Sequence, residues 1–151
     1  MKKIGTFLVL NGQAKEAAQF YTSLFKDSKV HNVVESNDGS VMVVEFDLEG
    51  QQFFALNAGP DYKFSEAISI YVSCDTQAEI DALWRKLTDG GEESICGWLK
   101  DRYGVSWQVA PTILPGLLTD PDPEKAGRVM AAMTDMRKLD IKKLKAAHAG
   151  V

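Results

Sequence analysis

The chain has 151 residues, of which 45% are hydrophobic and 25% are charged, and its formal net charge is −4. This length suits about one domain with a sizeable buried core, and the composition excludes general disorder. Only a short apolar run follows Lys2 and Lys3, and no stretch approaches the roughly 18 apolar residues of a membrane helix. We therefore expect a cytoplasmic protein without a membrane partner.

The distribution of charge and of metal-binding residue types excludes several other classes. From Asp120 onward, seven Lys or Arg outnumber five Asp or Glu, so the preceding body carries the acidic charge. An acidic body argues against a nucleic-acid partner, which usually requires a basic face. Cys74 and Cys96 are too few for a disulfide framework, and their spacing fits no zinc motif.

The first half of the chain predicts one strand, one helix and three further strands. A short apolar run from residue 4 to 10 ends at the turn signal Asn11-Gly12. From Ala14 the apolar residues recur at helical spacing and stop before Lys26. Three strand-like segments then follow, each bounded by turn residues, at 29–35, 41–48 and 52–57.

The second half repeats this order of elements. An alternating strand at 68–74 precedes Thr76-Gln77-Ala78-Glu79, a capping box that starts a helix. Gly90-Gly91 ends that helix, and strands are expected at 92–95, 98–100 and 105–109. The repeated order predicts two βαβββ modules, at about 4–58 and 66–111, within a domain spanning 1–119.

The block from Cys96 to Pro111 predicts a hairpin with two unlike faces. Asp101-Arg102-Tyr103-Gly104 is a turn in which Gly104 can adopt positive φ. In the strand that follows, Val105, Trp107 and Val109 share one face, whereas Ser106 and Gln108 share the other.

Residues 120–151 form a helical extension of the same domain. Asp122 and Asp140 are expected to cap two short helices. Helices of this length are marginal alone, so they must dock on their own body or on a second subunit. In the second case their apolar stripe would form a dimer interface, made of Val129, Met133, Met136, Ile141 and Leu144.

The sequence contains few catalytic motifs. The sequence has no glycine-rich dinucleotide or phosphate loop, no G-x-S-x-G, and no histidine in a triad context. Cys96 could be a nucleophile, although a small thiol beside a strand is more often a packing residue.

Three segments carry a family resemblance: Phe20-Tyr21, the run from Ala55 to Pro60, and the block C-G-W-L-K-D-R-Y-G-V-S-W-Q-V from Cys96. With them, and with the tail K-L-D-I-K-K-L, the chain resembles the PhnB-like branch of the glyoxalase, bleomycin-resistance and extradiol dioxygenase superfamily. The resemblance runs from Ile4 to about Ala147. It implies an α+β fold, in which paired βαβββ modules form a curled mixed sheet around a cavity, commonly completed by a homodimer.

The resemblance also implies where a metal would bind in active relatives. Counted back from Phe20-Tyr21, the first ligand position falls at Thr6. The second lies near Ala67 or Ile68, where Glu66 is the coordinating side chain within reach, and the third is Gln108. A hydroxyl and an amide bind a divalent ion far less well than two histidines and a carboxylate. We therefore expect no metal and no cofactor.

Three hypotheses for function follow. The first is a small-molecule binding protein whose cavity residues are Thr6, Asn57, Glu66, Trp98 and Gln108. Two of these have a plainer interpretation, because Trp98 could belong to the core and Asn57 could serve the turn at Ala58-Gly59. Gln108 is the strongest candidate, since a polar residue on the inner side of a strand needs a partner there.

The second hypothesis is a metal-dependent or metal-independent enzyme of this superfamily, of lyase, isomerase or transferase type. In it Glu66 acts as general base because burial raises its pKa. Proteins of this branch are often described as 3-demethylubiquinone methyltransferases. The chain lacks the glycine-rich strand-to-helix turn of a Rossmann-type S-adenosylmethionine enzyme, so that activity is not predicted. The third hypothesis makes the helical tail a dimer interface, which is compatible with either of the others.

Overall fold

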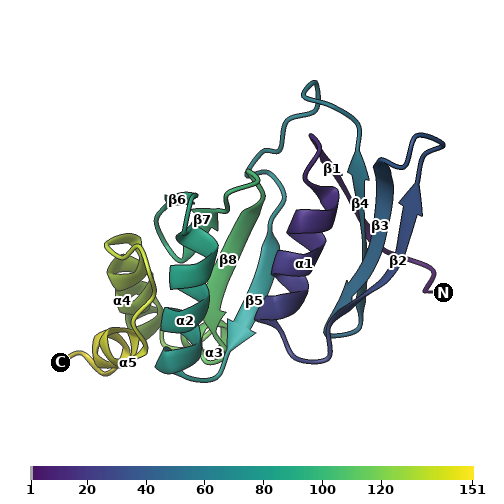
Figure 1. Ribbon diagram of the computed structural model, residues 1–151. Helices are drawn as coiled ribbons and strands as arrows, with labels where there is room; N and C mark the ends of the chain where they lie inside the picture. The colour runs from purple at the N-terminus through teal and green to yellow at the C-terminus, as the bar shows by residue number, and fades with distance from the viewer. Residues whose placement is uncertain (1) are drawn as a thin grey trace. The chain divides into compact units, whose positions relative to one another are not determined.

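The computed structural model describes residues 2–151, which form two compact units (Figure 1). The first unit ends at Lys63 and the second runs from Phe64 to Val151. Each unit contains one four-stranded mixed sheet with a helix packed on one face. The boundary follows the connector predicted at Ala58 to Asp61, and the helical extension belongs to the second unit.

The first unit has the predicted order of strand, helix and three strands. Its elements are β1 (Thr6–Leu10), α1 (Ala14–Leu24), β2 (Lys29–Glu35), β3 (Val41–Leu48) and β4 (Gln51–Asn57). The strand order is β1-β4-β3-β2, in which β1 lies parallel to β4 and the other neighbours are antiparallel.

The core of the first unit lies between α1 and one face of this sheet. On β3 the alternation buries Val44, Phe46 and Leu48, which all point to that face. The Phe46 ring stacks on Phe53 of β4, with ring centroids 5.3 Å apart. Its centroid also lies 6.3 Å from the ring centroid of Tyr21 on α1. The period-2 pattern of the strand and the period-3.6 pattern of the helix therefore meet in one apolar layer.

The second unit repeats the arrangement. Its sheet has the order β5-β8-β7-β6 and is formed by β5 (Ile70–Cys74), β6 (Glu92–Glu93), β7 (Trp98–Lys100) and β8 (Ser106–Pro111). The helix α2 (Gln77–Thr88) begins where the capping box predicts, because the Thr76 hydroxyl accepts a hydrogen bond from the Glu79 amide at 3.2 Å. The shared strand order confirms two βαβββ modules and the predicted α+β fold class.

Two strands of the second unit are shorter than the sequence predicts. β5 starts at Ile70 rather than at Ile68, whose side chain is exposed. β6 ends at Glu93, because the amides of Cys96 and Gly97 donate to the carbonyls of Met136 and Arg137, each at 2.8 Å. Within residues 94–97, the Ser94 amide turns back to the Trp98 carbonyl at 2.9 Å, and the amides of Cys96 and Gly97 bond to the C-terminal tail.

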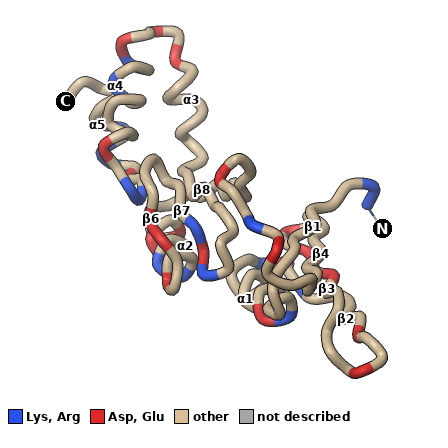
Figure 2. The backbone as a smooth tube through the Cα atoms, turned by 90° about the horizontal axis from the view of Figure 1, so that it is seen from above, with Lys and Arg blue, Asp and Glu red and all other residues tan. Residues whose placement is uncertain are grey.

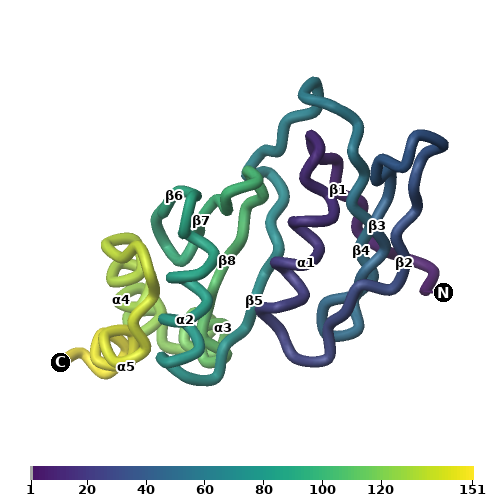
Figure 3. The backbone as a smooth tube through the Cα atoms, viewed as in Figure 1, coloured from purple at the N-terminus to yellow at the C-terminus, as the bar shows by residue number. Residues whose placement is uncertain are grey.

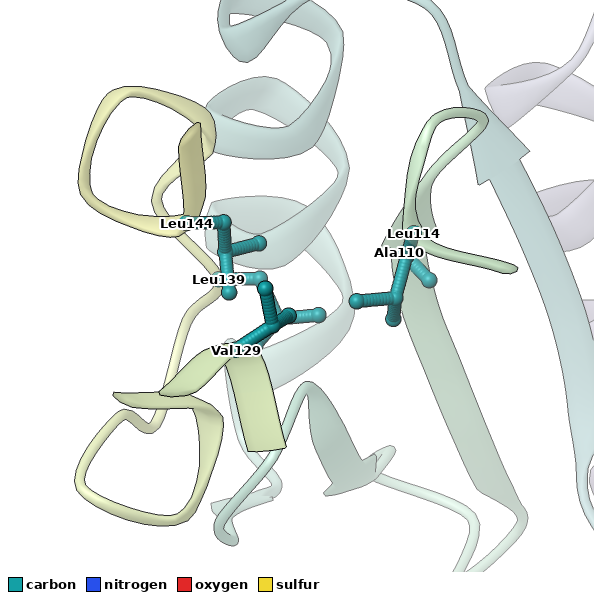
Figure 4. Close-up of a cluster of buried hydrophobic side chains, with 5 residues drawn as sticks. All are labelled: Ala110, Leu114, Val129, Leu139 and Leu144. Atoms are coloured by element: carbon teal, nitrogen blue, oxygen red, sulfur yellow. The ribbon is translucent and has the colours of Figure 1, made fainter. Parts of the chain in front are cut away.

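The C-terminal tail forms three helices that pack on their own unit (Figure 3). They are α3 (Leu114–Leu118), α4 (Pro123–Thr134) and α5 (Ile141–Ala149), and Asp122 and Asp140 cap the last two as predicted. Figure 4 shows the buried cluster that joins this tail to the end of β8, which comprises Ala110, Leu114, Val129, Leu139 and Leu144.

Polar contacts also fix the tail to α2. The Gln77 side chain donates to the Leu139 carbonyl at 3.0 Å and accepts from the Ile141 amide at 2.8 Å. Lys138 lies 2.8 Å from Asp81. Val129 and Leu144 are buried within the chain by the apolar cluster, so the hypothesis that they form a dimer interface is wrong for these two residues.

No helix among residues 2–151 combines the length and the apolar character needed to cross a membrane.

Candidate functional site

The sheet of the second unit has one face covered by α2 and one face opposite it. On the covered face, Leu99, Trp107 and Val109 are almost fully buried against the α2 side. On the opposite face, Trp98 pairs with Gln108, and Lys100 pairs with Ser106. The two unlike faces predicted for the strand after Gly104 are therefore confirmed, and the polar set faces away from the helix.

A buried carboxylate organises the hairpin between these strands. Asp101 is only 3% exposed, and one of its oxygens accepts from the amides of Tyr103 at 2.9 Å and Val105 at 3.0 Å. Its other oxygen accepts from the indole Nε1–H of Trp107 at 2.8 Å. The sequence indicates a turn at Asp101, but only the fold shows that this acid holds both the turn and the core tryptophan.

The face opposite α2 is hollowed near β6 and β7. The pocket has a volume of about 460 Å³. Ten residues of the second unit line it: Glu66, Glu92, Glu93, Ser94, Ile95, Cys96, Trp98, Leu99, Lys100 and Ser106. Its size is within the range typical of small-molecule sites, and its wall combines an aromatic ring, an aliphatic side chain and polar groups.

Ser106 is the most unusual member of this wall. The residue is 2% exposed, and its hydroxyl oxygen has no hydrogen-bond partner among the described residues. Buried polar atoms are nearly always bonded, because desolvation without a bond costs about 1–3 kcal/mol. The Ser106 hydroxyl is therefore an unsatisfied polar group in the pocket wall.

Glu66 lies at the rim of the pocket, where its carboxylate is 3.4 Å from the Lys100 ammonium and its side chain is 68% exposed. Its pKa is lowered, first by a hydrogen bond from its own backbone amide and then by the charge of Lys100. The expectation that burial raises the pKa of Glu66 is therefore wrong. A carboxylate with a lowered pKa is a weaker base at neutral pH, which argues against Glu66 as a general base.

The two other carboxylates of the pocket differ in their partners. Glu93 accepts a hydrogen bond from Nε1 of Trp84 on α2 at 2.7 Å. Glu92 pairs across the sheet with Lys100, and its carboxylate has no hydrogen-bond or ion-pair partner within residues 2–151. Figure 2 shows these acidic residues on β6 beside the mixed charges that follow β7.

Besides Glu66, the predicted ligand-binding residue Trp98 lines this pocket, and Gln108 lies next to it. Trp98 is half-buried and lines the pocket, so it is not a residue of the core. Gln108 is its cross-strand neighbour on β8, and its side-chain amide donates to the Ser69 hydroxyl at 2.9 Å. Gln108 thus has the partner that its position requires, and that partner comes from the protein.

The other two predicted residues, Thr6 and Asn57, lie in the first unit and on the helix-covered face of its sheet. Thr6 is exposed at the start of β1, and its side chain lies on the same face of the strand as the buried Leu8 and Leu10. Asn57 accepts from the Ala14 amide at the start of α1 at 2.9 Å and donates to the Val41 carbonyl at 3.1 Å. Its amide is therefore occupied by the fold, although in a helix cap and not in the turn at Ala58-Gly59.

The first unit has a pocket of its own, with a volume of about 480 Å³. Its polar side chains bond one another: His31 lies 2.5 Å from Asp47, and Gln52 donates to Glu45 at 3.1 Å. Since these groups are already paired, the pocket lacks an unsatisfied group comparable to Ser106.

The donor set does not fit the divalent metal of active superfamily members. Glu66 is paired with Lys100, Gln108 offers only an amide, and Thr6 lies on the helix-covered face of its own sheet. Within residues 2–151, no three His, Cys, Asp or Glu side chains are grouped so that they could hold a metal ion. The residues present therefore give no basis for a step through a metal.

Comparison with solved structures identifies the fold class first. The chain is similar to a glyoxylase/bleomycin resistance protein/dioxygenase domain from Frankia sp. EAN1pec, with 13% identity over 74% of this chain and 92% of that one and a TM-score of 0.51. It is also similar to the fosfomycin resistance protein FosX from Listeria monocytogenes, solved with Mn(II) and sulfate, with 13% identity, coverage of 72% and 92%, and a TM-score of 0.55. These likenesses show the fold of the glyoxalase superfamily.

A second, more specific finding follows from sequence. Residues 2–110 match the family model described as 3-demethylubiquinone-9 3-methyltransferase. A putative 3-demethylubiquinone-9 3-methyltransferase, PhnB protein, from Bacillus cereus is 36% identical over 74% of this chain and 100% of that chain, with a TM-score of 0.70. The chain therefore belongs to this family, the PhnB-like branch of the glyoxalase superfamily. No curated protein sequence matches the chain.

Proposed function

We propose that the chain binds a small organic molecule in the pocket opposite α2, without help from a metal ion. The observation that carries this proposal is the Ser106 hydroxyl, which is buried in the pocket wall and has no partner among the described residues. Trp98 and Ile95 supply apolar surface beside it, and Ile95 is 57% exposed. An apolar surface with one convergent polar group is typical of sites that bury an organic ligand.

The strained backbone of the pocket wall supports the same proposal. Cys96 has a φ of 60°, a left-handed conformation that is costly for a residue with a side chain. The two hydrogen bonds from Cys96 and Gly97 to the tail hold this conformation in place. The tail thereby fixes one side of the pocket, which limits the ordering cost of binding.

Fragment screening by NMR on the full chain tests this proposal. We expect hits that shift the Trp98 indole and the Ser106 amide, and we expect Trp98→Ala to abolish the shift of the Ser106 amide. Gln108→Leu, which changes the neighbouring side chain on the same face, should weaken binding only modestly, by about twofold, because the amide of Gln108 is paired with Ser69. A broad screen whose hits all survive Trp98→Ala would contradict the proposed site.

We also propose that the chain forms a homodimer through the first unit. The sheet face opposite α1 carries Phe7, which is 55% exposed and stacks on Phe54 with centroids 5.7 Å apart. Large exposed aromatic side chains are enriched in protein interfaces. Mass measurement in solution should give a dimer that Phe7→Lys converts to a monomer, whereas Lys29→Glu, an exposed change on β2, should leave it intact.

A further inference from the structure

The residues that line the pocket favour one chemical class of ligand, an inference that rests on the proposed function. Two carboxylates, Glu66 and Glu92, and one ammonium group, Lys100, belong to the pocket on the face opposite α2, so their formal charge is −1, whereas the Glu93 carboxylate is directed to Trp84 of α2. Lys100 already lies 3.4 Å from Glu66, and the Glu92 carboxylate has no hydrogen-bond or ion-pair partner within residues 2–151. The field in the pocket therefore disfavours anions and favours a cation.

The unpaired hydroxyl of Ser106 agrees with this electrostatic preference. Ser106, Lys100 and Glu92 form one cross-strand row on β8, β7 and β6. The hydroxyl oxygen can accept a hydrogen bond from an N–H group, and an ammonium carries several such donors and no acceptor. One ligand group can thus satisfy the buried oxygen and meet the negative charge beside it.

The aromatic and aliphatic surface completes the description of the ligand. Trp98 presents its indole to the pocket, and a cation near the face of an indole gains a further electrostatic attraction. Ile95 provides aliphatic contact for an apolar body. We propose that this pocket binds an organic amine in its ammonium form, with its apolar body against Trp98 and Ile95 and its charged group beside Glu92 and Ser106.

Three probes of similar shape but different charge test whether the affinity of the pocket depends on the charge of the ligand. Benzylamine is a cation at neutral pH, benzyl alcohol is neutral and benzoate is an anion. In NMR titrations of the full chain at low salt, benzylamine should bind about tenfold more tightly than benzoate, with benzyl alcohol between them. The shifts should centre on Trp98 and Ser106.

Substitutions in the pocket test which residues cause the preference for benzylamine. Glu92→Gln should weaken benzylamine binding about threefold and leave benzyl alcohol unchanged. Ser106→Ala should weaken benzylamine binding about fivefold. Glu35→Gln is the matched control, because it removes one negative charge from an exposed position on β2 in the first unit and should change neither affinity.

The outcomes separate this inference from the proposed function. Benzoate binding as tightly as benzylamine at this site would overturn the amine class and leave the proposed binding function intact. Equal losses from Glu35→Gln and Glu92→Gln would also overturn it, because the effect would then come from net charge. If none of the three probes shifts Trp98 or Ser106, both proposals fail.

Discussion

Asp101 and Ser106 are the two buried polar residues of the hairpin, and they differ in the number of hydrogen bonds they make. Asp101 accepts three hydrogen bonds from within the hairpin, whereas the Ser106 hydroxyl has no partner among the described residues. The first arrangement stabilises the fold and the second leaves an unsatisfied group. Asp101 thus stabilises the hairpin, whereas Ser106 belongs to the proposed binding site.

Replacing Asp101 tests the structural half of this assignment. Asp101→Ala leaves two backbone amides and the Trp107 indole without their acceptor, so the free energy of unfolding should fall by about 3 kcal/mol. Urea denaturation measures the change. Asp89→Ala, at a side chain 80% exposed, should cost less than about 0.5 kcal/mol, and equal losses in both variants would contradict a special role for Asp101.

Sequence patterns could identify these residues only partly. The alternation after Gly104 places Ser106 and Gln108 on one face, and the structure confirms that face. Sequence alone does not tell which of these two side chains has a hydrogen-bond partner. The partner of Gln108 is Ser69, which lies 39 positions away in the chain. The pocket residues Glu92, Ile95 and Lys100 were missed for the same reason, because they meet only when β6 and β7 pair.

At the scale of elements, α1 begins with help from a residue that is distant in sequence. Gln13 occupies the N-cap position without a side-chain hydrogen bond, and the Asn57 carbonyl oxygen binds the Ala14 amide instead. The same side chain donates to the Val41 carbonyl. Asn57 therefore ties the end of β4 to both α1 and β3.

Substitution of Asn57 should affect stability through these two bonds. Asn57→Ala should lower the free energy of unfolding of the chain by about 2 kcal/mol, because it removes the cap and the bond to Val41. Asn57→Asp keeps the acceptor for Ala14 and loses the donor, so it should cost about half as much. Thermal and urea denaturation compare the two variants. Equal costs would show that the helix cap contributes nothing.

Most boundaries of helices and strands were predicted correctly because their signals are local. The caps at Thr76, Asp122 and Asp140 are each bonded as predicted. The predicted strand 92–95 was too long because the Ser94 amide turns back to the Trp98 carbonyl, and the amides of Cys96 and Gly97 that follow bond to the tail, about 40 residues further along the chain. A sequence pattern contains no information about such a distant acceptor.

At the scale of the whole second unit, one acidic side chain attaches the tail to α2, and another links the start of the tail to α5. Asp81 lies 2.8 Å from Lys138, and Asp120 lies 2.7 Å from His148. The pKa of Asp81 is lowered, first by the hydrogen bond from Lys138 and then by that from Gln77. The pKa of Asp120 is lowered, first by the Asp122 amide and then by His148.

These lowered pKa values predict a loss of stability in acid. A carboxyl group with a lowered folded-state pKa contributes stability above its ordinary value of 3.8, and that contribution is lost as the pH falls through the folded-state pKa. The urea midpoint of the wild type should therefore exceed that of Asp81→Asn at pH 7, and the two should converge well below pH 3.8. Lys138→Met should reproduce the difference at pH 7. An unchanged difference between pH 7 and pH 3 would contradict this account.

The sequence by itself predicted the two βαβββ modules and the capped helices of the tail, because period, turn residues and caps act over a few positions. The family followed from the resemblance of particular segments, such as Phe20-Tyr21 and the block from Cys96. The sequence also determined that Trp107 and Gln108 occupy opposite faces of one strand. Only the tertiary structure decided that Asn57 caps a helix, that Glu66 is an exposed acid with a lowered pKa, and that Ser106 has no partner. The physical reason is that burial and hydrogen-bond partners depend on which distant segments are brought together, and the pairing of strands and the docking of the tail decide this.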